Sequence, residues 1–249
     1  MLEQYNVQVI GRVKSPYQQK FAIPRQPGLA SAAKGEIYLI GKVNNLDAIR
    51  DIQQFSHLWI IFLFHETMQQ GWQTLVKPPR LGGNKKTGVL ATRSNFRPNS
   101  IGMSVVKLEQ VAVRNEQIIL KISGHDLLNN TPVIDIKPYL PYCDSIVDAK
   151  AGYAQTAPAE QLQVSFSDTI NEQLQQLHNK YPDLKLLISQ VLAQDPRPAY
   201  KKQQQIDPKK YNIHLYDFNI QWQFIAEHTV LVVNLQSIEK TDSLTDNRE

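Results

Sequence analysis

Residues 88–111, GVLATRSNFRPNSIGMSVVKLEQV, contain two stretches typical of β-strands on either side of a short polar segment. Valine, leucine and isoleucine are frequent in the two outer stretches, and these residue types favour strands. The segment between them carries two arginines, two asparagines and a proline, which predicts a turn.

Similar runs recur from residue 5 to about 150. Strands this short and numerous, without a helix of 10–15 residues between each pair, argue against a doubly wound parallel sheet and favour a barrel or a strongly bent sheet. We expect strands in YNVQVIGRV (5–13), GEIYLIGKV (35–43), FSHLWIIFLF (55–64), TGVLATR (87–93), IGMSVVKLEQVAV (101–113), QIILKISG (117–124) and TPVIDI (131–136). The run LWIIFLF (58–64) suits a strand buried on both faces. A short helix is expected at 46–55, where Leu46, Ile49 and Ile52 keep helical spacing.

The composition changes after Tyr142. Residues 151–161 are small and polar and are typical of a surface connection, and two helical patterns follow. Their apolar faces are Phe166, Ile170, Leu174 and Leu177, and then Leu184, Leu187, Ile188 and Val191. Asp195, before Pro196, should end the second helix. The apolar runs 211–225 and 228–238 predict a hairpin joined at Ala226-Glu227.

The fold class that we predict is mainly β. It consists of a small β-barrel domain over residues 1–148, a smaller α+β C-terminal domain over residues 149–240 and a disordered tail over residues 241–249.

Composition points to a globular protein of the cytoplasm. The 249 residues are 42% hydrophobic and 20% charged, and no run approaches the roughly 18–20 apolar residues of a membrane helix. No signal peptide is visible at the N-terminus. Cys143 is the only cysteine, which is typical of a reducing compartment. We expect its side chain to be a small buried or half-buried hydrophobe.

Several familiar catalytic motifs are absent from the sequence. GxGxxG, GxxxxGK[ST], HExxH, GxSxG and CxxC do not occur, which argues against a Rossmann dinucleotide site, a P-loop, a zincin and a nucleophile elbow. His65-Glu66 lacks the second histidine of a zinc motif because position 69 is glutamine. We therefore expect no metal site.

Positive charge is concentrated in two segments of a chain whose net charge is +4. Residues 77–97 carry six cationic side chains and no acidic one, and a second cluster consists of Arg197, Lys201, Lys202, Lys209 and Lys210. Such clusters favour a polyanionic partner, or they are solvated loops that happen to be basic.

The NFRPN segment, residues 95–99, should present arginines from a rigid turn. Pro98 fixes its own φ and pushes Arg97 into an extended conformation, while asparagines tolerate unusual dihedral angles. Bidentate arginine is suited to carboxylate or phosphate, so the segment is interpreted as an anion-recognition loop. Alternatively, the arginines tie the loop to a carboxylate such as Asp126 or Asp135.

Four motifs in order closely resemble the YaeB/TsaA-like family, whose characterised bacterial members, called TrmO, are tRNA methyltransferases. The motifs are residues 88–111, FSHLWIIFLFH (55–65), DLLNNTPVIDIKPYLPYCD (126–144) and IPRQPGL (23–29). The resemblance covers about the first 145 residues. DPRPAY (195–200) and the hairpin after it resemble the C-terminal domain of the longer bacterial members.

The resemblance implies a homodimeric β-barrel that binds S-adenosylmethionine and methylates N6 of threonylcarbamoyladenosine, next to the anticodon of threonine tRNA. It places the cofactor contacts at Pro24, Arg25, Gln26, His65, Glu66, Arg93, Met103, Asp126, Leu127, Leu128 and Asn129. Asn129-Asn130 stands where relatives often have Asp-Gly.

The sequence does not identify which residue removes the proton from N6. Deprotonation of the carbamoylated N6 needs a carboxylate or a neutral histidine, and the candidates are Asp126, Asp135, Glu66 and His65. For Asp135 a structural ion pair with Lys137 or Arg97 is the stronger interpretation. We expect the tRNA to be held by Arg97, Lys85, Lys86, Arg197, Lys201 and Lys202. The alternatives are a catalytically silent RNA-binding β-barrel and a methyltransferase of the same fold with another acceptor.

Overall fold

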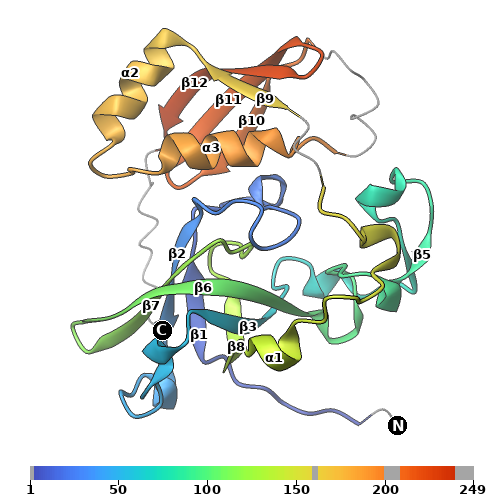
Figure 1. The fold of residues 1–249 in the computed structure, drawn as a ribbon, viewed down its shortest axis with the longest axis vertical. Helices are drawn as coiled ribbons and strands as arrows, with labels where there is room; N and C mark the ends of the chain where they lie inside the picture. Colours follow the sequence, from blue (N-terminus) through green and yellow to red (C-terminus); the bar gives the residue numbers. More distant parts are fainter. Residues whose placement is uncertain (1–2, 159–161, 199–207, 239–249) are drawn as a thin grey trace, which may run out of the picture.

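The computed structural model describes residues 3–158, 162–198 and 208–238 (Figure 1). The tail expected to be disordered (241–249) lies outside these residues, as do Lys201 and Lys202. Strands predominate and helices are few, so the mainly β prediction is confirmed. None of the helices within the described ranges is both long and apolar enough to cross a bilayer.

Six antiparallel strands of the N-terminal half form one closed sheet, in the order β1-β2-β7-β6-β3-β8, and β8 pairs back to β1. The strands are β1 (Gly11–Lys14), β2 (Lys34–Leu39), β3 (His57–Leu63), β6 (Ile101–Arg114), β7 (Gln117–Ser123) and β8 (Pro132–Pro138). Alternate side chains of each strand point inward, and together they form one hydrophobic core.

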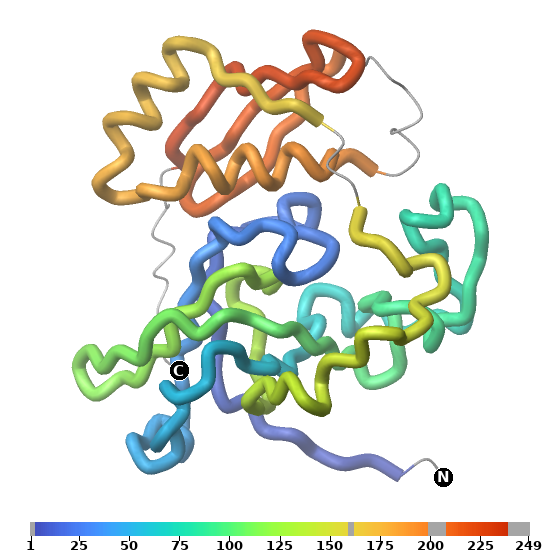
Figure 2. Tube along the Cα trace, in the orientation of Figure 1, coloured from blue at the N-terminus to red at the C-terminus, as the bar shows by residue number. Residues whose placement is uncertain are grey.

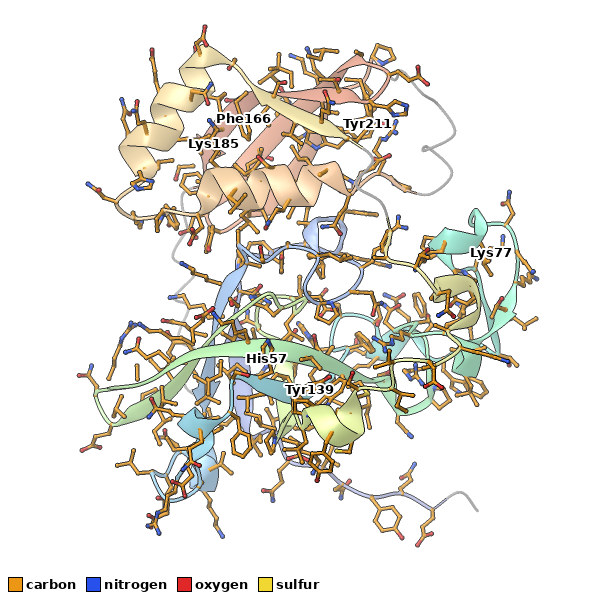
Figure 3. All side chains as sticks on the ribbon, in the orientation of Figure 1. His57, Lys77, Tyr139, Phe166, Lys185 and Tyr211 are labelled. Carbon is orange, nitrogen blue, oxygen red and sulfur yellow. The ribbon has the colours of Figure 1, made fainter. Side chains whose placement is uncertain are left out.

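Strand β3 shows the two faces of this closed sheet. Leu58, Ile60 and Phe62 are buried inside it, whereas Trp59 and Ile61 on the outer face are only half-buried. The prediction of a strand buried on both faces was therefore wrong, because a closed sheet has an interior on one side only. His57, the first residue of β3, and Tyr139 are labelled in Figure 3. Their ring centroids are 6.4 Å apart.

The helix expected at 46–55 is also absent. Residues 46–51 form turns, and only Ile52–Gln54 forms a short 3₁₀ helix (η3). Asp51 has φ 68°, in the left-handed region, which ends any continuous helix there. Ile49 and Ile52 still pack against the core of the closed sheet, so the apolar spacing reflected burial rather than helix.

Between β3 and β6 the chain leaves the closed sheet and forms an arm, residues 71–92, which lies to the right in Figure 1. Strands β4 (Leu75–Val76) and β5 (Thr87–Gly88) pair within it. The remaining 3₁₀ helices of the N-terminal half are η1 (Lys20–Ala22), η2 (Gly41–Val43), η4 (Met68–Gln70), η5 (Pro79–Leu81), η6 (Val89–Ala91), η7 (Pro98–Ser100) and η8 (Gly152–Ala154). Among residues 3–158, which the structure describes, one α-helix is present, α1 (Pro141–Asp144).

The C-terminal half is a four-stranded sheet of order β10-β11-β12-β9 with two helices. Its elements are β9 (Gln163–Phe166), α2 (Asp168–Leu177), α3 (Leu184–Ala193), β10 (Tyr211–Leu215), β11 (Phe218–Ala226) and β12 (Thr229–Ser237). Both predicted helices are present, but Phe166 belongs to β9, a strand parallel to β12 that the sequence did not predict. Lys185 Nζ of α3 lies 5.3 Å from the centroid of the Phe166 ring. Both residues are labelled in Figure 3.

The β1–β2 connection, residues 15–33, joins the two halves. Tyr17 and Ala33 are fully buried and belong to the hydrophobic core of the C-terminal half. Gln190 of α3 accepts a hydrogen bond from the backbone N–H of Ala32 (2.9 Å) and donates one to the Ser31 hydroxyl (2.9 Å). In Figure 2 this connection runs directly below α3. The two halves are therefore held together by shared core packing.

Candidate active site

The NFRPN loop adopts the turn that its proline predicts. Arg97 is extended (φ −110°, ψ 159°), and Pro98 begins η7. Asn99 (φ 63°) and Ser100 (φ 48°) take left-handed conformations. The backbone N–H of Phe64 donates to the Ser100 carbonyl (2.8 Å), which fastens the loop to the end of β3. The predicted turn and the extended Arg97 are confirmed.

The two arginines of this motif have different partners. Arg97 donates from Nη1 to the Thr92 carbonyl (3.1 Å), so it braces the loop to which it belongs. Arg93 donates from Nη1 to Oε1 of Gln26 (2.7 Å). This contact joins the PRQ run to the arginine motif across 67 positions of sequence.

Asp126 completes a cluster with Gln26 and Arg93. Ser104, which is buried in β6, donates from its hydroxyl to Oδ1 of Asp126. Burial raises the pKa of the Asp126 carboxyl, while the Ser104 hydrogen bond and the positive charge of Arg93 act in the opposite direction. The cluster therefore combines a largely desolvated carboxylate, a guanidinium and an amide at the wall of the closed sheet.

The segment after Asp126 contributes mainly to structure through its side chains. Leu127 is fully buried in the core of the closed sheet, and Leu128 packs against the core of the C-terminal half. Asn129 Oδ1 accepts from the backbone N–H of Ser15 (3.1 Å), and its Nδ2 donates to Gln18 (3.2 Å). An amide can do both, whereas a carboxylate could only accept.

His65 and Glu66 follow β3 and lie beside the NFRPN loop. His65 Nε2 is 3.5 Å from Oε1 of Glu66, whose side chain is largely exposed. The next residue, Thr67, accepts at its hydroxyl from Nδ2 of Asn95 (3.1 Å). This contact adds a second link between the end of β3 and the loop.

Met103 and Asp135 occupy the outer face of the sheet. Both pair with Ile61 in the strand register, and Met103 is 53% exposed. Because neighbouring residues of a strand point to opposite faces, the Met103 side chain points away from the buried Ser104. Asp135 pairs with Lys137 (3.0 Å), one of the two ion pairs that the sequence suggested.

Pro24 and Arg25 face the C-terminal half. Pro24 is buried, and burial lowers the pKa of the Arg25 guanidinium. The carboxylate of Asp195 opposes this shift, and the nearby Arg80 adds to it. Arg25 is thus electrostatically coupled to the C-terminal half, while its neighbour Gln26 contacts Arg93.

The same chain order of motifs and domains is found in known proteins. Residues 12–145 match the tRNA-methyltransferase O N-terminal domain, and residues 159–238 match the TrmO C-terminal domain. The chain belongs to the tRNA-methyltransferase O family.

Relatives of this family cover nearly the whole chain. The tRNA (adenine(37)-N6)-methyltransferase of Escherichia coli is 52% identical over 221 residues, which are 89% of this chain and 94% of that protein. A Pseudomonas aeruginosa protein with the provisional name S-adenosylmethionine-dependent methyltransferase RcsF is 41% identical over 235 residues, 93% of this chain and 97% of that protein. The crystal structure of TrmO from Pseudomonas aeruginosa superposes with a TM-score of 0.73 at 35% identity, covering 94% of this chain and all of that one.

In this tRNA-methyltransferase O family member, some basic residues of the arm are exposed to solvent and others contact the protein itself. Lys77, Lys85 and Lys86 are exposed on the arm, where Figure 3 labels Lys77. Arg80 of the same arm donates to the Thr156 carbonyl (2.6 Å) and so braces the arm against the connection to the C-terminal half.

Arg197 was expected to contact the tRNA, but the structure buries it. Its side chain is only 3% exposed, and Nε and Nη2 each donate to a different oxygen of Asp195 at 2.8 Å. The guanidinium also lies 4.2 Å from the ring centroid of Phe224. Buried in this way, Arg197 stabilises the C-terminal half and is not available to a phosphate on the surface.

Cys143 was expected to be buried or half-buried, and this prediction was wrong. It is exposed on α1 rather than buried, because the whole segment 141–150 lies on the surface.

Sequence reasoning missed Ser104, which contacts Asp126, and the burial of His125, which precedes it. Ser104 is a lone hydroxyl on the inward face of β6, between Gly102 and Val106, and the alternation of that strand could have revealed it. His125 is fully buried, and its Nδ1 accepts from the backbone N–H of Leu127 (3.3 Å). A substituted Cβ on Gly35 would lie 2.6 Å from His125 Nε2, so glycine is required for this packing.

Proposed function

We propose that this chain transfers a methyl group from S-adenosylmethionine to N6 of threonylcarbamoyladenosine at position 37 of threonine tRNA. The observation that carries the proposal is the contact of Gln26 with Arg93 beside the half-buried Asp126, since three of the four family motifs meet at this place. The names of the Escherichia coli and Pseudomonas aeruginosa relatives support the reaction class and the cofactor.

The chemistry of this cluster fits the cofactor. S-adenosylmethionine carries an ammonium and a carboxylate and supplies an activated methyl group when bound. Asp126 is suited to hold the ammonium, and Arg93 the carboxylate, with Gln26 keeping the guanidinium in place. We propose that the closed sheet acts as a cofactor-binding β-barrel over residues 1–148, to which Pro24 and the backbone of 127–129 contribute; Met103, whose side chain points away from Ser104 and Asp126, is not part of this site in the same protomer.

His65 is our candidate for the group that takes the N6 proton. Asp135 is committed to Lys137, Asp126 is assigned to the ammonium, and Glu66 is exposed. The Glu66 carboxylate near Nε2 of His65 favours the proton on that nitrogen and leaves Nδ1 as the acceptor. Replacement of His65 by alanine should lower kcat and leave the affinity for S-adenosylmethionine within a few-fold of wild type; unchanged kcat would exclude the role.

The acceptor tRNA is assigned to the basic arm, the NFRPN loop and the C-terminal half. Lys85 and Lys86 are exposed on the arm and suit phosphate contacts. Arg97 is partly exposed at the loop and is suited to the threonyl carboxylate or to a nearby phosphate. We propose that residues 149–240 form the α+β domain that contacts the tRNA.

We also propose a cytoplasmic homodimer. The outer face of β3 and β6 exposes apolar side chains that a second copy could cover, among them Ile101 (38% exposed) and Met103 (53% exposed). Sedimentation equilibrium of the wild type and of a Met103→Glu variant tests this: a monomeric wild type would contradict the proposal.

The first experiment is nucleoside mass spectrometry of threonine tRNA incubated with the purified protein, with and without S-adenosylmethionine. We expect a cofactor-dependent gain of one methyl group on threonylcarbamoyladenosine alone. A methyl group on another nucleoside would favour the same fold with a different acceptor. No methylation together with no cofactor binding would favour a silent RNA-binding protein.

A further inference from the structure

A cleft of about 300 Å³ lies between the β1–β2 connection and the end of α3. One wall is residues 20–25, the other is residues 194–198, and Pro79 of the arm lies at the edge. Its volume is at the lower end of the range of small-ligand sites, about 300–1,000 Å³. Because the cleft needs both halves of the chain, it exists only through the packing of residues 15–33 against the C-terminal core.

The charge of this cleft suits an anion. Lys20 and Arg25 line it on one side. The acidic lining residue on the opposite wall, Asp195, is engaged by the buried Arg197 at 2.8 Å in a two-point ion pair. With that carboxylate neutralised by Arg197, the charges of Lys20 and Arg25 give the cleft a positive potential.

Apart from Gln194, the remaining lining residues are apolar. Phe21 is 55% exposed although it is a large aromatic residue, and it lines the cleft together with Pro24, Pro196 and Pro198. Exposed aromatic rings beside cationic groups are the arrangement on which single-stranded nucleic acid stacks its bases.

The cleft adjoins the candidate active site at two points. Lys20 Nζ lies 5.7 Å from the ring centroid of Phe96, in the middle of the NFRPN loop. Arg25 precedes Gln26, which contacts Arg93. A nucleotide in the cleft would thus be close to a nucleotide presented to the loop.

We propose that this cleft binds one unstacked nucleotide of the tRNA, with its phosphate held by Lys20 and Arg25 and its base against Phe21. This inference rests on the proposed function and deepens it, since it assigns part of the substrate recognition to a surface that the two halves form together.

Equilibrium binding of threonine tRNA over a range of salt concentrations tests the cleft. Lys20→Gln should reduce the slope of log K against log salt by about 0.7, the contribution of one phosphate contact in a single strand. Phe21→Ala should weaken tRNA binding about tenfold, in the range of one lost base stack, whereas Phe21→Trp should keep near wild-type affinity. Lys20→Arg should restore the slope.

The matched control is Lys42→Gln, which removes an exposed lysine from η2, at the end of the molecule opposite the C-terminal sheet (Figure 2). Affinity for S-adenosylmethionine and the thermal midpoint are measured for every variant. We expect the cofactor affinity and the thermal midpoint to stay at wild-type values. A loss of cofactor affinity in Lys20→Gln would instead make the cleft part of the cofactor site and would overturn the proposal.

The proposal is overturned if Lys20→Gln has the same salt slope as Lys42→Gln, or if Phe21→Ala binds tRNA as tightly as the wild type. Failure of the proposed function has a separate signature: the wild-type protein would bind tRNA without methylating it. The binding data would then still decide the question of the cleft.

Discussion

Replacement of Arg197 by methionine should destabilise the protein strongly without a direct effect on tRNA contact. The methionine keeps an apolar side chain near the Phe224 ring but removes the guanidinium, so Asp195 loses its two-point partner while it stays 2% exposed. Breaking a buried ion pair from one side costs about 3–5 kcal/mol. The lost cation–π contact at 4.2 Å adds at most about 2 kcal/mol.

Urea unfolding followed by tryptophan fluorescence measures this loss, because Trp222 is buried in the same core. Asp195→Asn with Arg197→Met provides the control: the asparagine oxygen can still accept from the backbone N–H of Arg197 (3.2 Å), and no charge is left buried. We expect this double variant to be more stable than Arg197→Met alone, since the main cost is a buried carboxylate that has lost the guanidinium. A loss below about 1 kcal/mol in Arg197→Met, combined with weaker tRNA binding, would refute the reasoning and return Arg197 to the tRNA-contacting surface.

Three further predictions concern the site and its support. Asp126→Ala should abolish binding of S-adenosylmethionine in calorimetric titrations, whereas Asp135→Ala should bind within a few-fold of wild type; equal behaviour of the two variants would remove Asp126 from the site. Burial lowers the pKa of His125 to about 4, below its value in the unfolded chain. As the pH falls, the unfolded state therefore binds a proton on His125 before the folded state does. The free energy of unfolding should decrease by roughly 3 kcal/mol between about pH 6.5 and pH 4. Across that pH range the melting temperature of His125→Gln should fall less than that of the wild type. Identical profiles of melting temperature against pH would show that His125 does not cause the loss of stability. Arg97→Ala should weaken binding of tRNA that carries the threonylcarbamoyl group more than binding of tRNA that lacks it; equal losses would mean that Arg97 contacts a phosphate.

Local sequence signals predicted the elements whose shape depends on neighbouring residues. The alternation of 101–113 and 117–124 gave two paired strands, and the apolar spacing of 184–191 gave α3 with Leu187 and Ile188 in its core. Pro98 determined the turn at the NFRPN loop because its ring constrains both its own φ and the residue before it. The family motifs also include Gln26, Arg93 and Asp126, which the structure brings together.

What only the tertiary structure decided are contacts between segments distant in sequence. The parallel pairing of β9 with β12 and the burial of residues 15–33 against α3 depend on how two cores form together. The same packing buried Arg197, whose basic neighbours in sequence had suggested a surface role, and it placed Arg25 opposite Asp195. A charged residue has the same local pattern whether it is solvated or paired in a core, because its partner is supplied by the fold and not by adjacent residues. The sequence therefore determined the motifs and most of the elements, while tertiary packing decided which charges are free to meet a tRNA.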